Sequence, residues 1–285
     1  MYRRGHNEAV SKIASQENLA RGFESHHLRQ KKKCEVMMRE ERTKELIKAS
    51  VAIGLIVIAV IITSIICINY NVEGEKNIPF TLSKITIVST AEGVEKENTE
   101  EKWNLDIYQS NDIYFSIEKS SDAEETEAIK KLHIENIKVV EEPINGEIKC
   151  YMPNSSDGQL FTYKPEYIIE GNKLTFKGGT KSNSKTLEIG NQGGTVVMRI
   201  SNTNIGNYIS NDDEEISHDG SLISKIDKNI NDIKFKVNFD VIIETTNKSY
   251  LANITLNMPC EEDLIQKGTV SKEIKDNIVF KRLRK

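Results

Sequence analysis

The chain has little cysteine, proline and glycine, and each shortage excludes a class of protein. Four cysteines in 285 residues are too few for a disulfide scaffold. Five prolines and sixteen glycines exclude a collagen-like or low-complexity chain. Lys and Arg together number 39 against 43 Asp and Glu, so the net charge is −4. A protein without excess basic charge is not a general nucleic-acid binder, and we expect no nucleic acid among its partners.

Motifs that carry common chemistry are also missing from the sequence. No Gly-x-x-x-x-Gly-Lys-Ser/Thr, Gly-x-Ser-x-Gly or His-Glu-x-x-His is present. The glycine pairs at 178–179 and 193–194 do not lead into a helix pattern, so we interpret them as turns and not as phosphate loops. We therefore expect a protein that is not an enzyme and that has no catalytic residues and no cofactor.

One long uncharged segment stands out. Residues 49–72 contain no Asp, Glu, Lys or Arg, and 24 helical residues are enough to cross a bilayer core of about 30 Å. Thr63 and Ser64 can hydrogen-bond back to their own helix, so they do not interrupt it. No small-residue cleavage motif follows, and Ile66 before Cys67 does not fit a lipoprotein signal. The segment is predicted to be an uncleaved signal anchor in a single-pass membrane protein, with the lipid bilayer as its partner.

The flanking charges predict the orientation of this anchor. Residues 1–48 hold 12 basic and 7 acidic residues, whereas residues 73–285 hold 27 basic and 36 acidic residues. Because Lys and Arg stay on the cytoplasmic side, the N-terminus is predicted to be cytoplasmic and the C-terminus extracytoplasmic, at the cell membrane. The predicted domains are a basic cytoplasmic tail (1–48), the transmembrane helix (49–72) and an extracytoplasmic region (73–285).

The cytoplasmic tail has the composition of a helix but not of a folded domain. Residues 8–48 contain no proline and a single glycine, Gly22, and good helix formers dominate. The large apolar groups are few, so we expect one or two frayed helices without a core. The lysines at 31–33 would attract anionic lipid; the alternative is that they only fix the topology.

The extracytoplasmic region is predicted to be mainly β. In residues 233–244 every odd position is apolar, which indicates a strand with one buried face. A turn composition at 245–248 precedes a second alternating run to Met258, so the two runs are expected to be antiparallel neighbours. In this register Phe239 points into the core and Asp240 faces water.

Shorter strands are expected elsewhere in this region. The candidates are residues 84–89, 105–108, 112–118, 134–140, 147–152, 173–177, 196–201 and 277–281. One short helix is expected at 120–132, where acidic residues come first and lysines last. Many short strands favour an antiparallel sandwich, Ig-like or larger. One large sandwich and two small ones both fit the pattern.

Two groups of residues are candidate sites. The loop at 211–220 could bind Ca²⁺ through clustered carboxylates, although its spacing does not match an EF-hand and a solvated loop is the alternative; its carboxylates are Asp212, Asp213, Glu214, Glu215 and Asp219. Cys150 and Cys260 both lie outside the membrane segment. A bond between them would close a loop of about 110 residues, or each is a lone small apolar residue.

The layout suggests a class of function but not a ligand. Ile, Lys and Asn make up 93 of 285 residues, and their AT-rich codons favour a bacterial source. We expect a non-enzymatic cell-envelope protein whose membrane-anchored β region binds a protein or a polymer, or has a structural role. The alternative is a transmembrane signalling or regulatory protein whose tail binds a cytoplasmic partner.

Overall fold

The computed structural model describes most of the chain. Its described residues are 5–72, 78–96, 102–121, 123, 127–154, 158–180, 183, 186–210, 214–246, 248–275, 278 and 280–283, with side chains omitted for 5–28 and 68–72. The chain divides into two compact units, Met1–Asn69 and Tyr70–Lys285. We describe each unit by itself and call the second one the β body.

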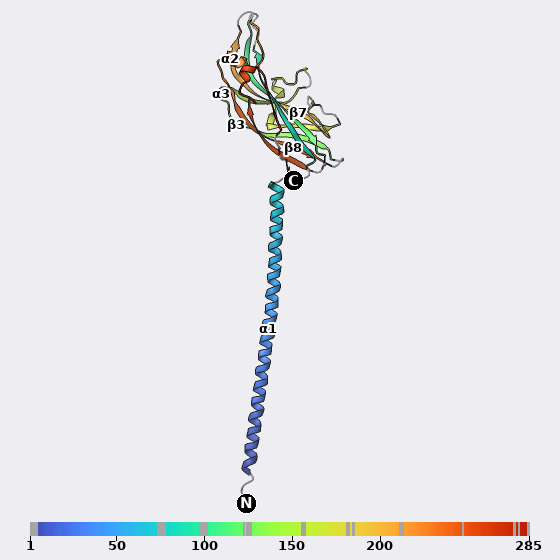
Figure 1. The fold of residues 1–285 in the computed structure, drawn as a ribbon, viewed down its shortest axis with the longest axis vertical. Coiled ribbons are helices and arrows are strands. Elements are labelled where there is room, and N and C mark those ends of the chain that lie inside the picture. The colour runs from blue at the N-terminus through green and yellow to red at the C-terminus, as the bar shows by residue number, and fades with distance from the viewer. Residues whose placement is uncertain are drawn as a thin grey trace. The chain divides into compact units, whose positions relative to one another are not determined.

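The first unit is one uninterrupted helix, α1 (Gly5–Val72), as Figure 1 shows. The tail was predicted to hold one or two helices, and it forms one, which continues through residue 48 into the apolar run. No proline interrupts these residues, and Thr63 donates a hydrogen bond to the Ala59 carbonyl at 2.8 Å, as expected. Among the described residues, this is the one helix long and apolar enough to cross a membrane.

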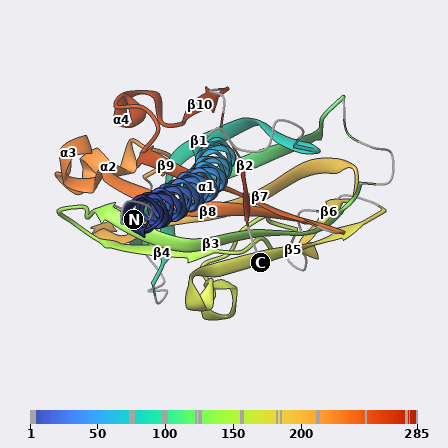
Figure 2. The same ribbon diagram turned by 90° about the horizontal axis from the view of Figure 1, so that it is seen from below.

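The second unit is built from two sheets, seen as two layers in Figure 2 with β1 and β2 in one and β3 and β5 in the other. The first sheet has the strand order β10-β1-β2-β7-β4. Its strands are β1 (Phe80–Glu95), β2 (Asn104–Lys119), β4 (Glu147–Tyr151), β7 (Gly193–Ile209) and β10 (Val270–Ile274). All of its described pairings are antiparallel.

The second sheet has the strand order β11-β9-β8-β3-β5-β6. Its strands are β3 (Ile129–Glu141), β5 (Lys173–Gly179), β6 (Glu188–Gly190), β8 (Phe235–Thr245), β9 (Ser249–Met258) and β11 (Lys281–Leu283). The pair β5–β6 is parallel and the other pairs are antiparallel. Short helices connect the strands: α2 (Leu222–Lys225), α3 (Ile230–Ile233), α4 (Leu264–Lys267) and the 3₁₀ turns η1 (Pro165–Tyr167) and η2 (Glu170–Asn172).

One main hydrophobic core joins the two sheets. Its buried side chains come from both, and Phe115 of β2 meets Phe239 of β8 edge to face with ring centroids 5.7 Å apart. Such a contact adds to the burial of the two rings. The β body is therefore mainly β, with one core between two sheets.

The predicted hairpin is confirmed. β8 and β9 are antiparallel neighbours, and Phe239 pairs with Ile254. The side chains of Val237, Phe239 and Val241 are completely buried. Asp240 lies on the opposite face and is half-buried.

Several other strands were predicted in the right places but with the wrong lengths. Residues 105–108 and 112–118 belong to one long strand, β2, because the polar residues between them are buried within the sheet. The strands β6 and β10 were not predicted, since each is short and exposes part of its length.

The helix predicted at 120–132 was wrong for the described residues of this range; residues 122 and 124–126 lie outside them. Strand β3 begins at Ile129, and the Ser120 amide donates to the Pro79 carbonyl at 2.9 Å. Ile129 and Leu132 are both buried because an irregularity in the pairing with β8 falls between them. Their spacing of three residues imitates a helical face, and burying such side chains outweighs helix propensities of a few tenths of a kcal/mol.

Candidate functional site

The acidic loop is only partly described. Asp212 and Asp213 lie outside the described residues. Glu214 accepts hydrogen bonds from the Tyr208 hydroxyl at 2.6 Å and from Lys225, whereas Asp219 accepts from the Ser221 amide at 2.8 Å. Glu215 is exposed to solvent. Among the described residues, no three His, Cys, Asp or Glu side chains gather where they could hold a metal ion.

The two cysteines of the β body are free thiols in this structure. Cys150 of β4 belongs to one row of paired residues across the first sheet. In this row Cys150 pairs with Ile200 of β7, Ile200 with Asn111 of β2, and Asn111 with Ser89 of β1. This row spans three strand spacings, about 14 Å. The Cys260 amide donates to Ser89 Oγ at 3.0 Å, at the far end of the row. A disulfide needs Cα atoms within about 7 Å, so the two residues are not placed for one.

Burial accounts for the chemical state of Cys150. It raises the pKa of the Cys150 thiol to about 12. The thiolate is the reactive form of cysteine, so this side chain is unreactive at neutral pH.

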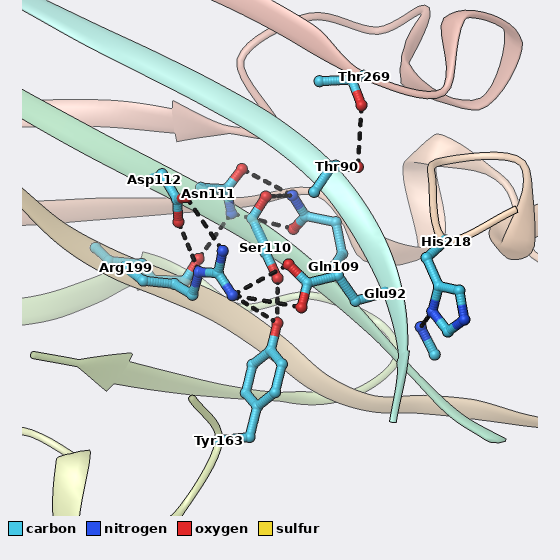
Figure 3. Close-up of polar contacts among 12 residues, drawn as sticks. Thr90, Glu92, Gln109, Ser110, Asn111, Asp112, Tyr163, Arg199, His218 and Thr269 are labelled. Atoms are coloured by element: carbon cyan, nitrogen blue, oxygen red, sulfur yellow. Dashed lines mark hydrogen bonds and ion pairs between the residues drawn. The ribbon is translucent and has the colours of Figure 1, made fainter. Parts of the chain in front are cut away.

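A partly buried polar cluster centres on Arg199 of β7, as Figure 3 shows. Its Nε and Nη2 donate to the two carboxylate oxygens of Asp112 at 2.6 and 3.1 Å. Its Nη1 lies 3.1 Å from Glu92 Oε1 and donates to the Tyr163 hydroxyl at 3.3 Å. The Arg199 side chain is 11% exposed, and those of Asp112 and Glu92 are 17% and 29% exposed. A two-pronged Arg–carboxylate pair of this kind is both strong and directional.

Aromatic residues from the segment 152–170 cover this cluster. The Arg199 guanidinium lies 4.7 Å from the Phe161 ring centroid. The Tyr163 ring meets Tyr108 and Tyr151 edge to face, at 4.8 and 5.3 Å between centroids. The Tyr163 hydroxyl also shares a short hydrogen bond with Ser110. The cluster therefore fastens a long connection between β4 and β5 onto the first sheet.

The electrostatics of the cluster are those of a closed ion network. Burial alone would lower the pKa of Arg199, but the hydrogen bonds and charges of Asp112 and Glu92, with Tyr163, keep it above its ordinary value. Burial raises the pKa of the Tyr163 phenol, which stays protonated. The guanidinium donates its hydrogen bonds to Asp112, Glu92 and Tyr163 of the same protein. The geometry therefore favours a role in bracing the first sheet over a role in binding a substrate.

A second buried polar group lies one row away, between the strands of the first sheet. Asn111 Oδ1 accepts from Ser89 Oγ and from Gln109 Nε2, both at 2.7 Å. Asn111 Nδ2 donates to the Ile200 carbonyl at 2.9 Å. These side chains are completely buried, and each finds a partner within the sheet.

The two histidines of the β body have separate structural partners. His133 of β3 is 2.9 Å from Thr175 Oγ1 and 3.5 Å from Glu244 Oε1. Burial, with Lys173 nearby, lowers the pKa of His133. His218 Nδ1 accepts a hydrogen bond from the Gly93 amide at 3.2 Å and thereby holds the end of β1, as Figure 3 shows.

An open cleft of about 810 Å³ lies where the β1–β10 edge of one sheet approaches β8 and β9 of the other. Its volume is in the range of ligand sites. Apolar core residues line it, among them Ile87, Phe235, Leu256 and Met258. Two ion pairs stand beside it, Lys236–Glu141 at 3.1 Å and Lys272–Glu261 at 3.2 Å. Of the sites described so far, the cleft is the most accessible to a ligand.

Sequence reasoning did not find the Arg199 cluster or the cleft. Arg199 lies in a strand that was predicted at 196–201, but nothing in the local sequence indicates its partners. The aromatic residues that cover it come from 152–170, a segment without a periodic pattern. Compared with known protein families, curated proteins and solved structures, the chain matches none.

Proposed function

We propose that the chain is a single-pass membrane protein whose β body lies outside the cytoplasm as a non-enzymatic binding or structural module of a bacterial cell envelope. In this proposal the two packed sheets form a sandwich, Ig-like or larger, that is antiparallel except at the β5–β6 pair. One observation carries the proposal: residues 49–72 are uncharged and lie on a single continuous helix. At 1.5 Å per residue they extend about 36 Å, enough for a bilayer core of about 30 Å.

Charge supports the proposed orientation. The eight Lys and Arg residues between 29 and 48 precede the apolar run, and residues 73–285 carry a net charge of −9 (27 basic minus 36 acidic). Basic residues next to a membrane segment are retained in the cytoplasm. The exposed side chains of the run, from Val51 to Ile66, would be covered by lipid.

The organisation of the β body supports a binding role. The polar cluster at Arg199 braces the first sheet, while the cleft beside β9 leaves a concave, partly apolar surface open. A braced scaffold with an open cleft is the arrangement of a binding module. The partner in this proposal is an envelope protein or polymer.

The test is a labelling experiment on the full chain with its native cysteines replaced. A cysteine reagent that does not cross membranes is expected to label Thr180→Cys, at an exposed position after β5, in intact cells. Ser15→Cys is expected to be labelled only after the cells are permeabilised. Labelling of Ser15→Cys in intact cells would overturn the orientation and the extracytoplasmic role.

A transmembrane signalling role is the second candidate, and the continuity of α1 favours it. The helix runs without interruption from the tail through the apolar segment, so it could transmit a rotation or a shift. Deleting residues 2–28 while keeping the basic residues from 29 to 48 separates the two functions. Signalling should be lost in this variant, whereas binding by the β body should be unchanged.

A further inference from the structure

The outer face of the β8–β9 hairpin carries residues that strands usually avoid. Asn and Asp are depleted in strands, yet this face presents them at two outward positions of each strand. We call the set the amide face; it consists of Asn136, Asn238, Asp240, Asn253, Thr255 and Asn257. The side chains of Asn136, Asn253, Thr255 and Asn257 are exposed, and the other two are half-buried.

Hydrogen bonds fix five of these side chains relative to one another, those of Asn136, Asn238, Asp240, Asn253 and Thr255. Asp240 accepts from Asn136 Nδ2 at 2.8 Å and from Asn253 Nδ2 at 2.7 Å. Asn238 and Asn253 exchange two bonds, at 2.7 and 3.0 Å, and Asn238 also donates to Thr255 Oγ1 at 2.8 Å. A surface array of oriented amides has already lost the side-chain freedom that a ligand would otherwise have to remove.

Strand pairing arranges the face in three rows. Asp240 pairs with Asn253, Asn238 with Thr255, and Lys236 with Asn257. The rows are two residues apart, so the first and third are separated by about 14 Å. Thr255 and Asn257 of the second and third rows also line the cleft. The amide face and the cleft therefore form one continuous surface.

Stability does not explain this choice of residues. Hydrogen bonds between exposed amides exchange with water and contribute little, and Thr at the same positions would favour the strand more. Asn136 even has a left-handed backbone with φ of 57°, which places its side chain against Asp240. Residues that a fold does not need, held in a fixed arrangement at the surface, indicate a ligand.

We propose that the amide face and the adjoining cleft bind a neutral polyhydroxylated chain, that is, a glycan polymer. Asn side chains both donate and accept hydrogen bonds, and Asp240 accepts them, which matches hydroxyl groups that do both. The proposal rests on the proposed binding function and names its ligand class. An anionic polymer fits poorly because the carboxylates in the three rows balance the lysines: the rows hold Glu135, Asp240 and Glu141 against Lys138, Lys173 and Lys236. A protein partner fits less well, because the face has no aromatic anchor.

The experiment is co-sedimentation of the full chain, in detergent, with insoluble cellulose, chitin and cross-linked dextran, and with anionic carboxymethyl-cellulose as the charge control. The test variant is Asn238→Thr/Asn253→Thr, which removes the oriented amides and keeps good strand formers. The matched control is Asn207→Thr, an exposed strand position on the other sheet. Thermal unfolding and molar mass by light scattering are measured on all three proteins.

The wild type and Asn207→Thr are expected to bind at least one neutral polysaccharide more tightly than carboxymethyl-cellulose. The double variant is expected to bind about tenfold more weakly, from the loss of one or two net hydrogen bonds, with an unchanged or higher unfolding temperature. Absence of wild-type binding, or equal binding by the double variant, would overturn the proposal. A lower unfolding temperature of the double variant would also overturn it, because the amides would then be structural. A wild-type dimer that the double variant does not form would overturn it as well, because a second copy of the chain would then occupy the face.

These outcomes are independent of the topology experiment. The co-sedimentation uses solubilised protein, so it reports on the surface of the β body whichever side of the membrane it occupies. A failed topology test with intact glycan binding would remove the envelope role and keep the site. The reverse result would keep the anchored module and remove the glycan.

Discussion

Replacing Phe239 by alanine tests the central packing of the β body. The side chain is completely buried on β8 and meets Phe115 across the two sheets at 5.7 Å. Replacing a buried Phe by Ala lowers the free energy of unfolding by about 3–5 kcal/mol. The lost contact between the two rings contributes about 0.5–1.5 kcal/mol to such a loss. A domain of ordinary stability has about 5–15 kcal/mol in total, so Phe239→Ala should remove a large share of it.

The assay is urea unfolding of residues 75–285, followed by circular dichroism. The slope of the transition should stay the same while the midpoint falls, because the exposed area on unfolding changes little. Asp240→Ala is the matched control one position along the same strand. It loses hydrogen bonds to Asn136 and Asn253 on a solvent-facing side, so it should cost about 1 kcal/mol or less. If Asp240→Ala proves more damaging than Phe239→Ala, the assigned register and the position of the core are refuted.

The remaining predictions use the same measurement. Residues 75–285 alone should be soluble and give a β-type circular dichroism spectrum, and a helical spectrum would contradict the fold. Arg199→Leu leaves the partly buried carboxylates of Asp112 and Glu92 without their charged partner, so it should lower the free energy of unfolding by about 3 kcal/mol and speed proteolysis within 152–170. An unchanged urea midpoint and an unchanged cleavage pattern would show that the cluster does not brace this segment. Burial, with Lys173 nearby, lowers the pKa of His133. The unfolded chain then takes up the proton first, so this contribution to stability is present above pH of about 6.5 and is lost as the pH falls below it. His133→Gln should make the free energy of unfolding depend less on pH over about two units around this value, roughly from pH 7.5 to 5.5. Equal slopes of stability against pH in the wild type and the variant would contradict this assignment.

Elements with a simple period could be predicted from the sequence. The β8–β9 hairpin alternates along most of its length, and the uncharged run at 49–72 lies on one continuous helix, as its composition predicts. The first part of strand β3 was assigned to a helix because an irregularity beside Ile129 gives its buried residues a helical spacing, whereas residues 134–140 were predicted as a strand. Local pattern alone does not reveal such a bulge, since its cause is the neighbouring strand.

The sites were harder to predict than the strands. The Arg199 cluster joins β1, β2, β7 and the segment 152–170, which lie far apart in the sequence. The amide face joins β3 to the hairpin in the same way. Asp240 was placed correctly on the outer face, but the amides that surround it come from strand pairing. Tertiary juxtaposition of this kind leaves no periodic signal in the chain.

The buried Asn111 group has a consequence for how the chain finds its native pairing. Along β2 the inward residues Ile113 and Phe115 face similar apolar residues on both neighbouring strands, so a slip by two residues would still put apolar against apolar. Such a slip would take Asn111 away from Ser89 and from the Ile200 carbonyl. Each buried polar group left without a partner costs about 1–3 kcal/mol. The polar residues at the middle of β2 therefore exclude alternative registers that its apolar residues would tolerate.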